Sequence, residues 1–281
     1  MHALDFDPSQ LPGAVLHSPY LNELTVALTA ARDAGLALTQ RWNRPIDVRQ
    51  KGVVNLVSEA DLEAERIVVS HLQSAFPSDG IIAEEDGEKP GQNTRVWHID
   101  PLDGTTNFTH GFPQFATSIA LVVDEQPIVG VVYDPLRNWY FFATSGGGAF
   151  LNSQALKVSG RRRLEASLLA TGFPYDRWTR PDNNVEIFGH FLRRCQGLRR
   201  AGAAALDLAF VAAGWLDGYW EKSLSSWDIA AGILLVREAG GCVTTYSHVG
   251  ATVESVDLVA TNEHIHGEVV DNIRSAMEAH R

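Results

Sequence analysis

The segment Trp97 to Asn107, with the sequence WHIDPLDGTTN, has the highest density of groups that could do chemistry. An apolar strand brings Asp100 to its end, and Pro101 prevents a helix and keeps that residue extended. Asp103-Gly104 then turns the chain, so that both carboxylates and the Leu102 carbonyl could face one small space. Oxygen ligands of this kind suit Mg²⁺. The alternative is an ordinary turn whose aspartates accept backbone N–H groups; it accounts for D-x-x-D alone but poorly for the whole composite.

The residues after this turn could bind an anion. Gly104, Thr105 and Thr106 stand at the start of a predicted helical turn, where backbone N–H groups favour a phosphate. The pattern therefore predicts a phosphate next to a hard cation.

Two more acidic segments are candidates for the same site. Glu84-Glu85-Asp86 follows the short apolar run Ile81-Ile82, and a solvated loop is its ordinary interpretation. A strand end just before the Asp100 turn nevertheless makes Glu84 a candidate third ligand. Asp228, in the segment WDIAAG, opens a predicted helix and would by itself be interpreted as a cap. The small residues that follow it permit close approach of another backbone.

Hydrophobic periodicity predicts the elements that position these residues. An amphipathic helix is expected over Tyr20 to Trp42, and an S-x-x-D signal at Ser58 and Asp61 starts a second one. Further strands are predicted at 81–82, 95–99, 115–123, 128–133, 139–144, 167–170, 218–221, 242–246 and 257–260. Further helices are predicted at 185–195, 203–213, 227–239 and from about 263.

This order of elements, with three strands spaced as an antiparallel meander, predicts an α+β fold. We expect one domain over residues 1–281 with two sub-halves, about 1–155 and 156–281. Histidines are scattered: His98 is expected to pack or form a hydrogen bond near Asp100, and His264 and His266 are expected at the surface.

Composition excludes several classes of partner. The formal net charge is −11, with 34 acidic against 23 basic residues, which argues against nucleic-acid and anionic-membrane binding. No apolar run approaches the roughly 20 residues that span a bilayer. Met1 to Gln10 has no secretory pattern, and Cys195 and Cys242 make no disulfide framework, so a cytoplasmic protein is expected.

Together these residues resemble the inositol monophosphatase family of lithium-sensitive, magnesium-dependent phosphatases. Glu221, in the segment GYWE, falls where that family has a substrate-contacting glutamate. The segments that match in order are Lys51-Gly52 through Val57 to Asp61, Ala83-Glu84-Glu85, Asp100 to Asn107, and Trp227 to Gly232.

The resemblance implies a layered α/β/α/β/α sandwich, of the type shared with fructose-1,6-bisphosphatase, and a homodimer. It implies two Mg²⁺ ions and a weaker third. The implied ligands are Glu84, Asp100 and the Leu102 carbonyl for the first ion, Asp100, Asp103 and Asp228 for the second, and Glu84 for the third.

The resemblance also implies roles for the remaining site residues. Asp61 and Thr105 would form a pair that, with Glu84, orients the attacking water. Asp103 and the backbone amides of Gly104 and Thr105 would contact the substrate. Ala204 and Glu221 would face the polyol.

The sequence departs from the family at two places. Asn55 stands where relatives often have aspartate or glycine, so a supporting charge near Lys51 is in doubt. Ser225 and Ser226 stand where some inositol-selective relatives have His and Cys, which weakens an inference about inositol more than one about phosphate.

The expected function is Mg²⁺-dependent hydrolysis of a small phosphate monoester, inositol 1-phosphate or a related polyol or sugar phosphate, by direct attack of metal-activated water. Histidinol phosphate, fructose 1,6-bisphosphate and 3′-phosphoadenosine 5′-phosphate are alternative substrates on the same scaffold. The alternative from another class is a non-catalytic regulatory protein that binds a macromolecular partner.

Overall fold

The computed structural model describes residues 11–44, 48–50 and 56–279, with the backbone alone at 48–50 and 56–58. Its helices are α1 (Gly13–Leu16), α2 (Leu21–Arg41), α3 (Glu59–Ala75), α4 (Thr105–Thr109), the 3₁₀ turn η2 (Leu164–Ala166), α5 (Val185–Leu192), α6 (Ala204–Ala212), α7 (Ser226–Glu238) and α8 (His266–Glu278). Its strands are β1 (Val48–Gln50), β2 (Leu56–Ser58), β3 (Gly80–Ala83), β4 (Gly87–Lys89), β5 (Arg95–Asp103), β6 (Ala116–Val123), β7 (Gln126–Asp134), β8 (Trp139–Thr144), β9 (Gly148–Leu151), β10 (Gln154–Ala155), β11 (Leu168–Thr171), β12 (Gly197–Arg199), β13 (Gly218–Lys222), β14 (Cys242–Thr244) and β15 (Asp257–Thr261).

Two large sheets organise the chain. The first has the strand order β10-β9-β8-β7-β6-β5-β3-β4 and the second has the order β12-β11-β13-β15-β14, while β1 and β2 form a small separate pair. Strands β6, β7 and β8 are the predicted antiparallel meander, which is confirmed. Strand β3 instead runs parallel to β5, so the carboxyl ends of these two strands lie at the same edge.

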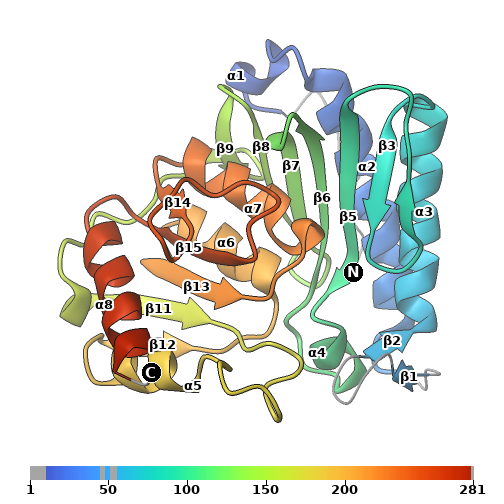
Figure 1. The fold of residues 1–281 in the computed structure, drawn as a ribbon. Helices are drawn as coiled ribbons and strands as arrows, with labels where there is room; N and C mark the ends of the chain where they lie inside the picture. The colour runs from blue at the N-terminus through green and yellow to red at the C-terminus, as the bar shows by residue number, and fades with distance from the viewer. Residues whose placement is uncertain (1–10, 45–47, 51–55, 280–281) are drawn as a thin grey trace.

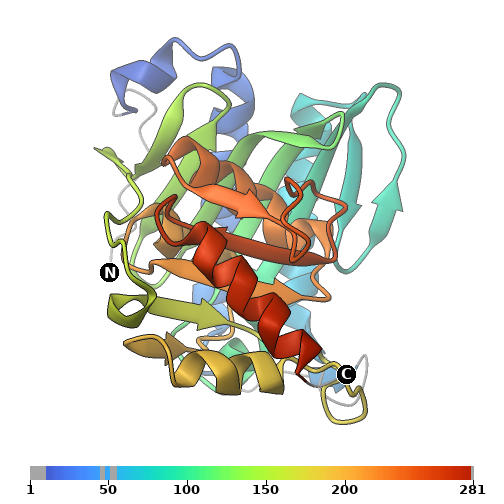
Figure 2. The same ribbon diagram turned by 60° about the vertical axis from the view of Figure 1, so that its left-hand side comes forward.

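The helices separate into layers around the sheets (Figure 1). Helices α2 and α3 pack on one face of the first sheet, and α6 and α7 lie between the two sheets. Helices α5 and α8 cover the outer face of the second sheet, where α8 crosses in front of it in Figure 2. Three apolar cores fill the interfaces between layers: one lies between the first sheet and α2 and α3, one surrounds α6 and α7 and reaches both sheets, and one lies between the second sheet and α5 and α8. The predicted α/β/α/β/α sandwich is confirmed.

Helix α7 is enclosed on both sides. All eight residues from Ile229 to Val236 are buried, as expected of a helix that contacts apolar surface around its whole circumference. A Cβ atom added to Gly130 of β7 would lie 3.0 Å from the Ala231 Cα atom, and one added to Gly232 would lie 2.3 Å from Leu208 of α6. The close approach predicted from the small residues of α7 is therefore confirmed.

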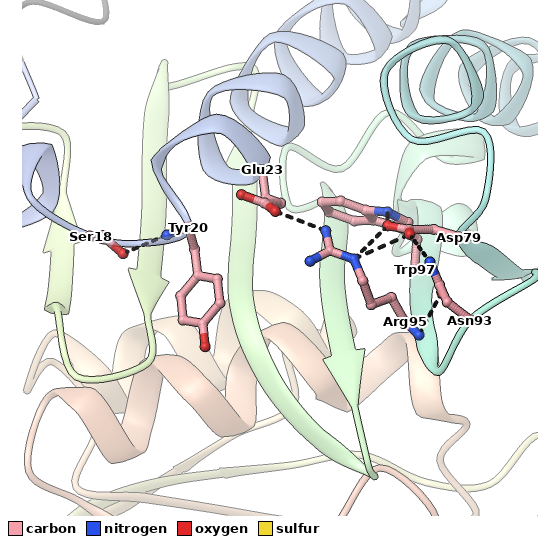
Figure 3. A network of polar contacts seen from close by, with 7 residues as sticks. All are labelled: Ser18, Tyr20, Glu23, Asp79, Asn93, Arg95 and Trp97. Atoms are coloured by element: carbon pink, nitrogen blue, oxygen red, sulfur yellow. Dashed lines mark hydrogen bonds and ion pairs between the residues drawn. The ribbon is translucent and has the colours of Figure 1, made fainter.

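A polar network fastens α2 to the first sheet (Figure 3). The Arg95 guanidinium of β5 donates to Glu23 of α2 at 2.9 Å and to both oxygens of Asp79 at 3.1 and 3.2 Å. Trp97 Nε1 donates to the same Asp79 carboxylate at 3.1 Å. These contacts hold β5, the strand with the acidic turn, against the helical layer.

Most predicted elements are present, with shifted ends. The helix predicted over 20–42 is α2, but the one predicted over 185–195 ends at Leu192, and the short strand β12 follows it. Strands β4, β9 and β10, which complete the ends of the first sheet, were not predicted. Cys195 and Cys242 are free thiols. The two sub-halves, about 1–155 and 156–281, stay a prediction.

Over the described residues, no helix is both long and apolar enough to cross a membrane. Lys51, Gly52 and Asn55 lie outside the described residues, as does the Ser58 side chain of the predicted cap.

Candidate functional site

The acidic turn is built on a bulge at the end of β5. The strand does not end at Ile99 as predicted: it continues to Asp103, with a register shift against β6 between Asp100 and Asp103. The shift leaves Pro101 out of the pairing, so its missing N–H costs no ladder hydrogen bond. Gly104 then takes a positive φ of 97°, a conformation that favours glycine. The bulge allows a proline and two aspartates to occupy a buried strand.

Asp100 and Asp103 are both buried, with 2% and 7% of their surface exposed. Asp100 Oδ1 accepts the backbone N–H of Leu102 at 3.0 Å. Asp103 accepts the N–H groups of Ala204 and Ala205 at 3.0 and 2.8 Å, one on each oxygen. Asp103 therefore joins the turn to the first residues of α6, and Ala204, predicted to face a polyol, has its backbone amide in this contact.

Glu84 and Asp228 approach the turn from two other elements. The parallel register of β3 and β5 pairs Ala83 with Ile99, which brings Glu84 level with Asp100. Asp228 lies in the first turn of α7, where its Oδ2 accepts the Ser225 N–H at 2.7 Å in a capping box. The capping interpretation of Asp228 is thus correct, and it coexists with a place in the cluster.

The electrostatics of these groups reflect their proximity. Burial raises the pKa of Asp100 well above its usual value, and repulsion from Glu84, Asp103 and Asp228 raises it further. Burial likewise raises the pKa of Asp228, with Glu84 and Asp103 adding repulsion. The pKa of Asp103 rises to about 7, again mainly through burial. Carboxylates in this position favour either protons or bound cations.

The donor set fits a hard divalent cation in chemistry: buried carboxylates and a backbone carbonyl, all oxygen ligands. In the described ranges, no three acidic, histidine or cysteine side chains are already arranged as a metal-ligand set. The assignment of ligands therefore stays a prediction.

Thr105 and Asp61 are a hydrogen-bonded pair. Thr105 Oγ1 lies 3.0 Å from Asp61 Oδ1 and 3.2 Å from the Leu102 carbonyl oxygen. Asp61 is fully buried in the first turn of α3, and Thr105 opens α4. The predicted partners thus meet beside the acidic turn.

Glu221 of β13 faces the cluster from the second sheet. The Tyr219 hydroxyl donates a hydrogen bond to it, and burial raises the pKa of Glu221 to about 7. A Cβ atom at Gly172 would lie 2.0 Å from a Glu221 oxygen, so the glycine leaves the space that this carboxylate occupies.

The sequence did not single out two residues that belong to the site. Glu65 of α3 is buried and accepts the backbone N–H groups of Glu85 and Asp86 at 2.9 and 2.7 Å, which shapes the turn that begins at Glu84. Tyr175 is 56% exposed as a residue, yet burial raises the pKa of its hydroxyl, and repulsion from four carboxylates, first Glu84, raises it further, so the hydroxyl lies near the cluster. A glutamate in a helix and a tyrosine in a loop have no distinguishing pattern in the sequence.

The histidine predictions had opposite outcomes. His98 Nδ1 lies 2.7 Å from Ser226 Oγ, which confirms a hydrogen bond near Asp100. His264 is exposed, as expected, but His266, also expected at the surface, is buried, with its ring nitrogens 2.8 and 2.9 Å from the hydroxyls of Thr261 and Thr244. That prediction was wrong because α8 begins three residues later than expected and turns His266 inward against β15.

Comparison with known proteins gives a consistent result. Residues 21–278 match the model of the inositol monophosphatase family. The chain is 44% identical over 249 residues to inositol-1-monophosphatase of Synechocystis, covering 88% of this chain and 86% of that protein. It is 45% identical over 246 residues to Nus factor SuhB of Pseudomonas aeruginosa, covering 85% and 91%.

A solved structure shows the same fold. The extragenic suppressor protein suhB from Bartonella henselae superposes with a TM-score of 0.86 at 40% identity, covering 90% of this chain and 98% of that one. With a family match over nearly all described residues and relatives above 40% identity, the chain belongs to the inositol monophosphatase family.

Proposed function

We propose that the protein is a Mg²⁺-dependent phosphatase that hydrolyses a small phosphate monoester, inositol 1-phosphate or a related polyol or sugar phosphate. The observation that supports this most is the convergence of Glu84, Asp100, Asp103 and Asp228, from the end of β3, from β5 and from α7, beside the hydrogen-bonded pair Asp61 and Thr105. Family membership supports the same class of reaction.

Each acidic residue has a proposed place in cation binding. One Mg²⁺ would be held by Glu84, Asp100 and the Leu102 carbonyl. A second would be held by Asp100, Asp103 and Asp228. A weaker third ion would be bound by Glu84. When bound, the ions supply positive charge that activates water and neutralises phosphate oxygens. They would also relieve the repulsion that raises the pKa of Asp100.

The remaining groups orient the reactants. The Thr105 hydroxyl donates a hydrogen bond to Asp61, so a lone pair of Thr105 Oγ1 is left to accept a hydrogen bond from the attacking water. Glu84 would help to orient the same water. The backbone N–H groups of Gly104 and Thr105, at the start of α4, would receive the phosphate oxygens. No phosphorylated protein residue is expected.

The leaving group would lie toward the second sheet. Glu221, Ala204 and Tyr175 surround this side, and the Glu221 carboxylate can accept hydrogen bonds from sugar or polyol hydroxyls. Histidinol phosphate, fructose 1,6-bisphosphate and 3′-phosphoadenosine 5′-phosphate are the alternative substrates. A homodimer, lithium sensitivity and a cytoplasmic location belong to the same proposal.

The names of several relatives favour a second candidate function. Proteins from Escherichia coli and Pseudomonas aeruginosa, 41% and 45% identical to this chain, are named Nus factor SuhB rather than phosphatase. A regulatory protein that binds a macromolecular partner is therefore the alternative, although a net charge of −11 gives little support to nucleic acid as that partner.

The test is phosphate release from a panel of inositol, histidinol, sugar and nucleotide phosphates, with Mg²⁺ and with chelator. Asp100→Asn is the matched variant; it keeps the side-chain shape and should lose at least about 100-fold in rate, because one carboxylate serves both ions. Phosphate release that is equal with chelator, or equal in a folded Asp100→Asn variant, would overturn the proposal. The absence of turnover on every substrate would favour the regulatory alternative.

A further inference from the structure

A hydrogen bond between His98 and Ser226 connects the two elements that present Asp100 and Asp228. His98 Nδ1 of β5 lies 2.7 Å from Ser226 Oγ of α7, across 128 positions of sequence. His98 is 3% exposed and Ser226 is partly buried. The contact is therefore largely shielded from water.

The two residues of this contact lie close in sequence to the two aspartates. His98 and Asp100 are two residues apart on a strand, so their side chains point to the same face of the sheet, the face that α7 covers. Ser226 and Asp228 both lie in the first turn of α7, and Asp228 is near enough to Asp100 to repel it. The His98–Ser226 contact therefore joins β5 to the turn of α7 that carries Asp228.

A second polar contact joins the first sheet to the start of α7. Ser118 Oγ of β6 donates to the Trp227 carbonyl oxygen at 3.3 Å, a longer distance than that between His98 and Ser226. The shorter contact is the one made by β5, the strand that carries Asp100.

We propose that His98 and Ser226 are a positioning pair that holds the β5 and α7 carboxylates at the separation a divalent cation requires, and so determines the cation affinity. The inference rests on the proposed function for the identity of the cation site. Neither residue touches the cation or the substrate; both act through the elements that they join.

The test measures cation binding directly, by calorimetric titration of the full chain with Mg²⁺ and Mn²⁺. Ser226→Ala and His98→Ala should each raise the dissociation constant about tenfold, the effect typical of groups that orient metal ligands. The double variant should bind the cation no more weakly than the single variant with the lower affinity, because both substitutions remove the same contact. Ser226→Thr, which keeps the hydroxyl, should restore most of the affinity.

His266→Ala is the matched control, since His266 is also a buried histidine hydrogen-bonded to hydroxyls, but those of Thr261 and Thr244. It should lower the melting temperature and leave cation affinity unchanged. Ser226→Ala removes only one oxygen atom, so it keeps the test possible if His98→Ala fails to fold.

The outcomes separate the two proposals. Cation binding by the wild type with unchanged affinity in Ser226→Ala and His98→Ala would overturn the positioning pair alone. Additive losses in the double variant would also overturn it. A wild type that binds neither cation would overturn the cation site and the positioning pair together.

Discussion

The hydroxyl oxygen of Thr105 lies 3.0 Å from Oδ1 of Asp61, which joins the start of α4 to the first turn of α3. Both residues are buried, and 44 positions separate them in the chain. A buried threonine oriented by a buried carboxylate is suited to hold a water molecule in a fixed direction.

Removing the Thr105 hydroxyl should therefore affect turnover more than binding. We expect Thr105→Ala to lower kcat by about 100-fold or more, because the attacking water loses the group that orients it, while the calorimetric Kd for Mg²⁺ changes little. Thr105→Ser should retain most activity, and Thr106→Ala, at the exposed neighbouring position, should be close to wild type. An equal loss in Thr105→Ala and Thr106→Ala would contradict a specific role.

A methyl group at position 172 should disturb the leaving-group side of the site. The Cβ atom of Gly172→Ala would lie 2.0 Å from a Glu221 oxygen, so the carboxylate must move. We expect the KM for inositol 1-phosphate to rise about tenfold, as for one lost charged hydrogen bond. Hydrolysis of p-nitrophenyl phosphate, which has no polyol, should change much less. Gly189→Ala, where the added atom meets nothing within 4 Å, is the control; equal effects on both substrates would argue against a polyol contact.

The close contact between β7 and α7 should be sensitive to a single carbon atom. Gly130→Ala would place a Cβ atom 3.0 Å from the Ala231 Cα and carbonyl oxygen, both backbone atoms. Overpacking of this kind costs about 1–3 kcal/mol. Urea unfolding should show that decrease in the free energy of unfolding for Gly130→Ala. Gly160→Ala, with open space around the added atom, should leave the free energy of unfolding nearly unchanged. A Gly130→Ala variant as stable as wild type would mean that the two layers can separate freely.

The pH dependence of stability should include a contribution from His266. Burial, and then the neighbouring His248, lowers the pKa of His266 to about 4, below the usual value of 6.5. The unfolded chain binds this proton first, so the contribution of neutral His266 is complete above pH 6.5 and is lost as pH falls toward 4. It amounts to roughly 3 kcal/mol.

Removing the titration should make this visible. The difference in free energy of unfolding between wild type and His266→Gln, measured with urea, should become smaller as pH is lowered from 7 to 4.5. A difference that stays constant over that range would show that the pKa of His266 is the same in the folded and unfolded protein.

Much of the architecture follows from local sequence patterns. The meander was predictable because β6, β7 and β8 are long, rich in branched and aromatic residues, and separated by short turns. Strands β4, β9 and β10 were not, because two to four residues are too few to establish a period. The extension of β5 through Pro101 depends on a bulge, which is set by pairing with β6 rather than by the strand itself.

The candidate site shows the same limit. Asp100, Asp103 and Asp228 lie in segments whose prolines, glycines and small residues are informative, and the structure brings them together. Glu65 and Tyr175 were missed because their importance comes only from what lies across from them. The partner of His98 likewise could not be read locally, since Ser226 is 128 positions away.

The enclosure of α7 between two sheets limits how this segment can diverge. A helix at a surface can accept changes on its outer side, but the run from Ile229 to Val236 has no outer side. A larger residue at position 231 would need room made at Gly130, and one at position 232 would need room made at Leu208. A substitution in this helix should therefore occur together with compensating substitutions in the neighbouring layers. Engineering of α7 would have to change the residues that pack against it at the same time.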